Sequence, residues 1–438
     1  MSRNAHYLLL FLAVTGISPL TKGQVITTIV NVDTIPGYNG DGIACGTAEL
    51  QQPAFIAADA AGNMYITDQG NSRIRKIDAS GIITTIAGTG TNGFSGNGGP
   101  GTAAQIAFPD CITPDAAGNV YFIDNTNCVR KINTSGIISV FAGDTGLGSV
   151  GFGGDGGPAT AAILDHPGGL AADAAGNVYI ADYGNGRIRK VNTSGIISTY
   201  AGDSLNRIGA SAIKLDASGN LYFIANNSYV RKLDTNGAIT TIAGTASHTS
   251  HTIGDGGPAT DAYLNSPGDI AVDAAGNIYI SDDINARIRM VNTAGIISTF
   301  AGNGVFGFSG DGGLATLAAM NTNAGINFDR NWNLLIADFG NNCIRSVSSV
   351  ESVQQINNTD MGMVVYPNPC NGVFTCNIPA QKNEDATITI MDMAGNKVKE
   401  IHASANNSIN VKMDVPAGIY FVVATAIEGR WCSKIVVN

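Results

Sequence analysis

The sequence predicts an all-β protein: a six-bladed β-propeller followed by a small Ig-like β-sandwich. One segment, complete at Asp173–Gly202, recurs in variants that begin at Asp59, Asp115, Asp216, Asp273 and Asp329. Each copy contains four short β-patterned runs, and a C-terminal stretch carries seven further runs with a different pattern. Repeats of roughly 40–60 residues with four strands are typical of architectures in which each unit buries its apolar face against its neighbours.

The composition agrees with this fold class. The chain has 438 residues, of which 56 are glycine, 44% are hydrophobic and only 13% are charged, with a net charge of −10. Disorder needs high charge and low hydrophobicity, so it is excluded. A dispersed acidic surface repels phosphate backbones, so nucleic acid is not an expected partner.

The first element is a targeting segment, residues 1–23. Arg3 precedes an apolar run, Tyr7–Val14, that small and polar residues follow as far as Gly23. These features predict a secretory signal peptide, with an uncleaved anchor as the alternative. A membrane-spanning helix needs about 20 apolar residues, and no stretch of the chain reaches that length, so no transmembrane anchor is expected.

The repeats fill residues 24–348. In the fifth copy the four predicted strands are 269–273, 278–282, 287–292 and 296–301. Between the first two stands Asp-Ala-Ala-Gly-Asn, in which Asp opens a turn and Gly takes the left-handed position. The turn explains each residue of this motif, so a functional Asp-Gly-Asn site is the weaker interpretation.

Longer segments connect the units, as at Gly154–Leu164 and Gly254–Leu264. They lead from the outermost strand of one unit to the innermost strand of the next, which is a propeller connection. The last repeat lacks its fourth strand, and the isolated run Val25–Ile29 matches a fourth strand, Ile82–Ile86. We therefore expect the N-terminal strand to complete the last blade.

Two recurring charges are expected to be structural. Asp stands at the end of the second strand in five repeats, and Arg stands in the third strand in all six. A catalytic site is asymmetric, so a group present in nearly every copy favours Asp–Arg pairing over ligand contact.

The connecting loops are the expected recognition surface, because binding residues concentrate on loops held by a rigid scaffold. Turn chemistry is the alternative explanation of their Gly-Asp-Gly-Gly motif. Calcium is a candidate ion for the aspartates, and no other cofactor is expected. The candidate binding residues are Asp155, Asp255, Asp311, Phe152, Phe308, His166, His248 and His251.

Enzymatic activity has little support. The chain has five histidines, and it lacks a Gly-x-Ser-x-Gly elbow and a His-Glu-x-x-His motif. A metal-assisted lyase or hydrolase at the channel mouth, using His166, His248 or His251, is the alternative class, although a solvated loop histidine is the favoured explanation of each of these residues. The seven cysteines contain no CxxC pair that would indicate zinc.

After a polar linker, residues 349–362, the C-terminal domain of residues 363–438 reads as a small β-sandwich. Its seven predicted strands are 364–366, 372–377, 386–391, 397–401, 408–413, 418–424 and 434–437.

Two resemblances refine these predictions. The segments Gly176–Asp182 and Asn185–Lys190, with the Gly-Asp-Gly-Gly loop, resemble NHL repeats, which implies a propeller but no single function because the family includes binding modules and enzymes. The tail resembles the type A C-terminal sorting domain of the type IX secretion system. The residues that carry this second resemblance are Pro367, Asn368, Pro369, Gly372, Gly395, Pro416, Gly418, Tyr420 and Lys434.

The sorting domain implies recognition by the type IX translocon and delivery to the outside or outer-membrane surface of a diderm bacterium. We therefore expect a secreted or surface-attached module that binds an extracellular protein or glycan. An extracellular lyase or hydrolase and a structural surface component are the alternatives.

Overall fold

The computed structural model describes residues 24–144, 150–203, 205–245, 253–321, 325–349, 363–378, 385–392, 397–405, 407–426 and 429–437. These residues form two compact units, which lie within residues 1–349 (the repeat unit) and 350–438 (the tail unit). The predicted signal peptide lies outside the described residues, as does nearly all of the predicted linker.

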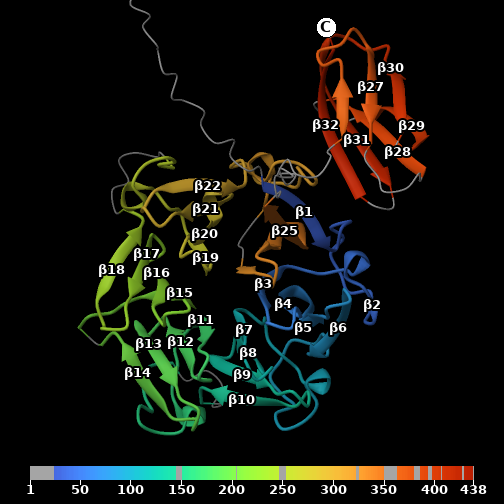
Figure 1. Cartoon of the computed structure of the whole chain (residues 1–438). Helices are drawn as coiled ribbons and strands as arrows, with labels where there is room; N and C mark the ends of the chain where they lie inside the picture. Colours follow the sequence, from blue (N-terminus) through green and yellow to red (C-terminus); the bar gives the residue numbers. More distant parts are fainter. Residues whose placement is uncertain are drawn as a thin grey trace, which may run out of the picture. The chain divides into compact units, whose positions relative to one another are not determined.

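The described part of the repeat unit contains six antiparallel sheets, sheets 1–6 in chain order, that radiate from one axis (Figure 1). The strands of each sheet are given from the innermost outward. Sheet 1 contains β3 (Pro53–Ala58), β4 (Met64–Asp68), β5 (Arg73–Ile77), β6 (Ile82–Ala87) and β2 (Ile43–Ala44). Sheet 2 contains β7 (Ile112–Pro114), β8 (Val120–Asp124), β9 (Cys128–Ile132) and β10 (Ile138–Ala142). Sheet 3 contains β11 (Pro167–Ala172), β12 (Val178–Asp182), β13 (Arg187–Val191) and β14 (Ile197–Ala201), and sheet 4 contains β15 (Ala210–Leu215), β16 (Leu221–Ala225), β17 (Tyr229–Leu233) and β18 (Ile239–Ala243). Sheet 5 contains β19 (Pro267–Val272), β20 (Ile278–Asp282), β21 (Arg287–Val291) and β22 (Ile297–Ala301), and sheet 6 contains β23 (Ile326–Phe328), β24 (Leu334–Asp338), β25 (Cys343–Ser349) and β1 (Gln24–Val30).

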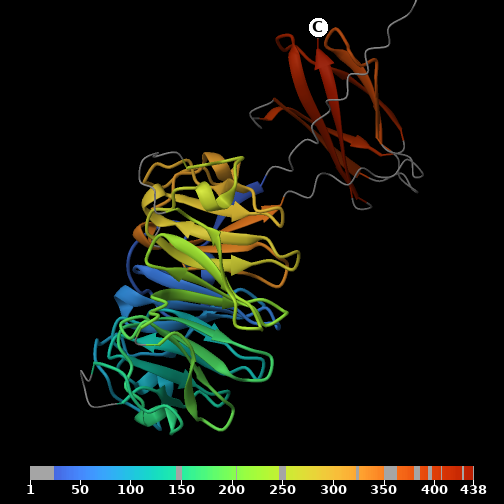
Figure 2. The same cartoon turned by 90° about the vertical axis from the view of Figure 1, so that its left-hand side faces the viewer.

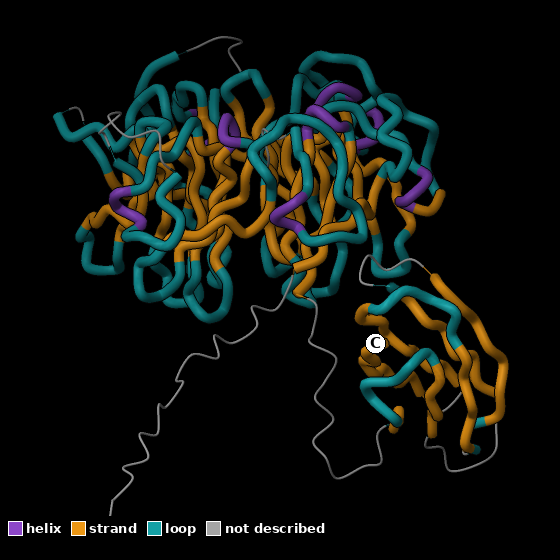
Figure 3. The backbone as a smooth tube through the Cα atoms, turned by 90° about the horizontal axis from the view of Figure 1, so that it is seen from above, coloured by secondary structure: helices purple, strands orange, loops and turns teal. Residues whose placement is uncertain are grey.

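The innermost strands contact one another around the axis in the order β3, β7, β11, β15, β19 and β23, and β23 contacts β3. Figure 2 shows the sheets side on, and Figure 3 shows the strands between two layers of loops. Small residues allow the inner strands to approach closely: a Cβ at Gly169 of β11 would lie 2.8 Å from the amide nitrogen of Ile213 in β15. The chain is thus all-β with repeated four-stranded sheets, as predicted.

Short 3₁₀ helices stand in the loops of the repeat unit (Figure 3). They are η1 (Cys45–Thr47), η2 (Gln69–Asn71), η3 (Gly101–Ala103), η4 (Ala159–Ala161), η5 (Ala259–Asp261), η6 (Asp283–Asn285), η7 (Ala315–Leu317) and η8 (Phe339–Asn341).

The N-terminal strand completes sheet 6, which confirms that prediction. Strand β1 pairs antiparallel with β25, from Gln24 opposite Ser349 to Val30 opposite Ile344. The side chains of Ile26 and Val30 are fully buried, whereas Thr27 faces solvent. The closure therefore combines ladder hydrogen bonds with apolar burial.

The hairpin turns have the predicted chemistry. In sheet 3, the Asp173 carboxylate accepts a hydrogen bond of 2.8 Å from the Asn177 amide, and Gly176 has φ of +88°. The hydrophobic core lies between neighbouring sheets, as where Ile188 of sheet 3 packs with Ile213 and Phe223 of sheet 4.

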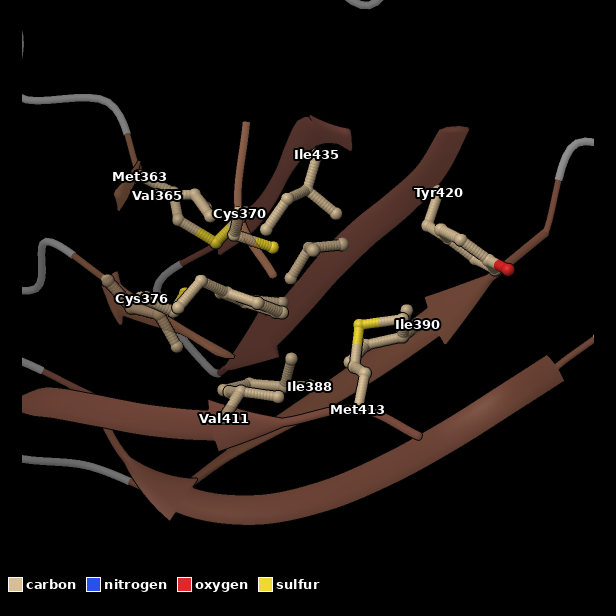
Figure 4. Close-up of a cluster of buried hydrophobic side chains, with 14 of the residues drawn as sticks. Met363, Val365, Cys370, Cys376, Ile388, Ile390, Val411, Met413, Tyr420 and Ile435 are labelled. Carbon is tan, nitrogen blue, oxygen red and sulfur yellow. The ribbon is translucent and has the colours of Figure 1, made fainter. Parts of the chain in front are cut away.

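The tail unit contains two antiparallel sheets. One has the order β26 (Val364–Tyr366), β27 (Val373–Asn377), β30 (Ser408–Lys412), and the other has the order β29 (Lys397–Ser404), β28 (Asp385–Met391), β31 (Gly418–Ala426), β32 (Gly429–Val437). Buried side chains from both sheets, among them Val411, Ile388 and Ile435, form one core (Figure 4). The seven predicted strands are present, but the last begins at Gly429 rather than Lys434 because it pairs with the whole length of β31.

Several residues of the sorting motif form hydrogen bonds within the tail unit. Asn368 accepts a hydrogen bond of 2.9 Å from the Val436 amide, and the Tyr420 hydroxyl donates one of 2.9 Å to the Pro416 carbonyl. Gly372 has φ of +77°, and its carbonyl accepts a hydrogen bond from the Met413 amide. Gly395 and the Lys434 side chain lie outside the described part of the chain.

Candidate ligand site at the channel mouth

A buried arginine anchors five of the six sheets. Its guanidinium lies 3.1–3.7 Å from the aspartate that ends the second strand of the same sheet, and both side chains are fully buried. The pairs are Arg75–Asp68, Arg130–Asp124, Arg189–Asp182, Arg289–Asp282 and Arg345–Asp338. The predicted structural pairing is therefore confirmed.

The three predicted binding aspartates form ion pairs with these same buried arginines. Asp155, Asp255 and Asp311 accept bonds of 2.5–2.6 Å from Arg189, Arg289 and Arg345, respectively. Each aspartate lies in the connecting loop that precedes the sheet of its arginine, so these contacts do not bring the three carboxylates together. Each carboxylate already faces a guanidinium, which is a poor neighbour for Ca²⁺, so the calcium prediction gains no support from this geometry.

The predicted aromatic residues pack on the same arginines. The Phe152 ring centre lies 4.7 Å from the guanidinium carbon of Arg189, and the Phe308 ring centre lies 5.0 Å from that of Arg345. These cation–π contacts help to stabilise the loops beside sheets 3 and 6. His248 and His251 lie outside the described residues.

His166, by contrast, stands at the channel mouth beside the inner strand β11. Its side chain is 73% exposed, and its Nδ1 lies 2.5 Å from the Asp165 carboxylate. Its backbone has φ of +47°, and its amide donates to Asn127 Oδ1 at 3.0 Å. The scaffold therefore fixes the backbone while the imidazole faces solvent.

A cavity of about 570 Å³ opens beside His166, between sheets 2 and 3. Its lining includes the exposed rings of Phe108 and Tyr183 and the half-buried carboxylate of Asp110. An adjoining cavity of about 470 Å³, which shares Asp110, is lined by residues from all six sheets. The two cavities define the mouth of the axial channel, and their sizes are typical of small-molecule sites.

Two positions in each repeat supply the variable side chains of this mouth. The first precedes the inner strand and keeps a left-handed backbone whatever its side chain: Gln52, Phe108, His166, Gly209 and Ser266 have φ between +39° and +58°. The second begins the loop after the second strand, and its residues are Gln69, Asn125, Tyr183, Asn226, Asp283 and Phe339. The side chains at these two positions differ from repeat to repeat, although the surrounding scaffold is regular. These positions therefore make the channel mouth asymmetric.

Charged residues stand on or just before three of the inner strands, at positions where the other repeats have uncharged residues. They are Asp110, two residues before β7, Lys214 in β15 and Asp269 in β19. Burial and the neighbouring Asp269 carboxylate raise the pKa of Asp110 to about 6. Burial raises the pKa of Asp269, and the nearby Lys214 ammonium opposes that shift.

Cysteine and metal chemistry add little to this site. Burial raises the pKa of the Cys111 thiol to about 12, so this cysteine is a poor nucleophile at neutral pH. Within the described ranges, no three His, Cys, Asp or Glu side chains are grouped to hold a metal ion.

Of these residues, the sequence prediction includes His166 but not Phe108, Asp110, Tyr183 or Asp269. The signal is present in the sequence, because an alignment of the six repeats places Asp110, Lys214 and Asp269 in columns whose other members are uncharged. The prediction instead names Asp155, Asp255 and Asp311, because the Gly-Asp-Gly-Gly motif recurs in the connecting loops.

Comparison with known proteins supports both units. Residues 364–438 match the Secretion system C-terminal sorting domain, and residues 32–94, 150–211 and 249–308 match the Teneurin NHL domain. Mouse Teneurin-4 is 28% identical over 355 residues, and the match covers 70% of this chain and 12% of that protein. Drosophila melanogaster Teneurin-m is 25% identical over 430 residues, and the match covers 83% of this chain and 15% of that protein. The chain thus spans about an eighth of the length of mouse Teneurin-4.

Solved structures show the same fold. A protein of unknown function from Bacteroides thetaiotaomicron has a TM-score of 0.54 at 21% identity, covering 74% of this chain and 76% of that one. An auxiliary nutrient binding protein from the same organism has a TM-score of 0.55 at 16% identity, with the same coverages.

The class defined by these findings is an all-β protein with propeller-like repeats. More particularly, the chain joins NHL repeats to a secretion system C-terminal sorting domain, which confirms both resemblances. The sorting domain implies export by the type IX machinery to the cell surface or the outside. No helix among the described residues is long and apolar enough to cross a membrane.

Proposed function

We propose that the repeat unit is a secreted or surface-attached binding module for an extracellular protein or glycan. In this proposal the ring is a six-bladed β-propeller, the tail unit is an Ig-like sandwich, and the ligand binds at the channel mouth beside His166. A signal peptide at residues 1–23 delivers the chain to the periplasm, and the sorting domain then directs it to the type IX translocon of a diderm bacterium.

A single observation carries this proposal: the side chains at the channel mouth differ from repeat to repeat, whereas the repeats that hold them are alike. Packing explains the residues that every repeat shares. Packing does not require Phe108 and His166 in left-handed positions, where a side chain costs about 1–2 kcal/mol relative to glycine. The two residues instead line a cavity together with Tyr183 and Asp110, as residues of a recognition site do.

Protein and glycan arrays probed with the exported full chain test the proposal. The matched variant is Phe108→Gly combined with His166→Gly, because Gly209 occupies the same position in sheet 4 and the fold should be kept. We expect a hit with the natural chain that the double variant loses. Blank arrays, or a hit that the folded double variant retains, would contradict a ligand site at this mouth.

A further inference from the structure

The opposite end of the channel carries a residue that the repeat does not predict. The left-handed position of the first hairpin turn is glycine in five repeats, with φ between +83° and +89° at Gly62, Gly118, Gly176, Gly219 and Gly276. In sheet 6 the same position is Trp332, with φ of +63°. A bulky side chain is strongly disfavoured in this backbone conformation.

Burial does not compensate for this conformation, because Trp332 is 55% exposed. Its ring centre lies 5.6 Å from that of Phe328, which in turn lies 5.0 Å from that of Tyr279. Trp332 is therefore the exposed end of a row of aromatic rings that meet edge-to-face or at a tilt. An exposed aromatic residue held in a strained backbone indicates a function other than folding.

Two cavities meet at this tryptophan. One, of about 350 Å³, lies at the turn end of the channel and is lined by Trp332, Phe328, Asn327, Lys214 and Arg330. The other, of about 320 Å³, is lined by Trp332 and Phe328 with Tyr279 and Phe300. Both volumes are at the lower end of the usual range for small-molecule sites.

The charges around the first cavity balance. Lys214 and Arg330 face the same space as the carboxylates of Asp59 and Asp329. Asp59 accepts hydrogen bonds from Asn63 and Tyr65, and Asp329 accepts them from its own turn, so both carboxylates are held in place. An ion of either sign would meet a like charge here.

A neutral ligand with many hydroxyl groups fits this lining best. Lysine, arginine and asparagine donate hydrogen bonds, and the carboxylates retain acceptor capacity. The C–H face of a pyranose ring packs on an indole, which has a large apolar face with negative potential. We propose that Trp332 and the turn-end cavity bind a neutral saccharide, with the sugar ring stacked on the indole and its hydroxyls bonded to Lys214 and Arg330.

This inference places a second site on the opposite face and narrows its ligand to a neutral saccharide, and it uses none of the residues that line the two cavities at the His166 mouth. Cellopentaose, chitopentaose and mannopentaose, titrated into the full chain by calorimetry, provide the test. Tryptophan emission gives a second readout in a Trp431→Phe background, because the chain has 2 tryptophans.

We expect at least one of these sugars to bind and to change the emission of Trp332. Trp332→Gly restores the residue of the other repeats, so it should remain folded while its affinity falls at least tenfold, and Trp332→Phe should keep most of the affinity. Asp261→Ala, at an exposed position of η5 outside the cavities described above, should bind the sugar normally.

Three outcomes would overturn the inference: no binding of any of the three sugars, undiminished binding by Trp332→Gly, or tighter binding of a glucuronate oligosaccharide than of its neutral counterpart. Array binding that depends on Phe108 and His166 would survive each of these outcomes, so the two proposals fail separately.

Discussion

At the scale of single residues, the buried arginines show why repeats resemble one another. Each guanidinium is removed from water and is compensated by a buried carboxylate and by loop acceptors. Removing one partner of such a pair leaves an uncompensated charge, which costs about 3–5 kcal/mol. Sheet 4 lacks the carboxylate, because Ala225 stands in its place.

Asp282→Ala should therefore lower the free energy of unfolding by about 3 kcal/mol, since Arg289 would lose its buried partner. Urea unfolding of the repeat unit measures this loss. Asp261→Ala, at an exposed position of η5, is the matched control and should change stability by less than about 0.5 kcal/mol. Equal midpoints for the two variants would show that the buried pair is unimportant.

Asp110 gives a prediction with a defined pH window. Its pKa rises from 3.8 to about 6 on folding, so ionisation of this carboxyl destabilises the folded state and stability falls as pH rises from about 4 to 6. Asp110→Asn should thus be more stable than the natural chain by about 1–3 kcal/mol at pH 8. Unfolding at pH 4 should show almost no difference, and a constant difference at both pH values would contradict the assigned environment.

At the scale of elements, the N-terminal strand decides whether the ring closes. Ile26 is fully buried in the core cluster formed by sheets 5 and 6, and β1 covers the edge of β25. Deletion of residues 24–30 would expose that edge to other chains. We expect a markedly lower melting temperature together with association, measured by calorimetry and light scattering.

Point variants of β1 separate packing from simple chain shortening. Ile26→Ala should cost about 2–5 kcal/mol, whereas Thr27→Ala, on the exposed side of the same strand, should cost far less. An unchanged monomeric melt after the deletion would contradict the closure.

The elements were more predictable from sequence than the site. Six copies of one pattern repeat the alternation and the turn residues, so strands such as β20 and turns such as Asp173–Asn177 followed from local chemistry. The site depends on which positions of the repeat face the channel axis. Those positions are known only once the packing of the sheets around the axis is known. Asp110 and Lys214 lie far apart in sequence and approach the same channel only in the closed ring.

At the scale of the whole molecule, the proposed function assigns export to the tail unit and ligand binding to the repeat unit. A chain without residues 363–438 should fold its repeat unit but stay inside the outer membrane, because the sorting signal is missing. Fractionation of cells and medium measures this retention. The matched control is the full chain with Phe108→Gly, which should be exported normally because it changes only the channel mouth.

The central claim is that the residues that depart from the repeat bind the ligand, whereas the repeated residues hold the scaffold. The affinity of the exported chain for its array ligand, measured by calorimetry, tests it most directly. The account predicts that the variant Phe108→Gly with His166→Gly binds at least tenfold more weakly, and that Asp155→Asn, once shown to be folded, binds within about twofold of the natural chain, a difference below about 0.5 kcal/mol. A loss of affinity confined to Asp155→Asn would contradict the account and return the site to the connecting-loop aspartates.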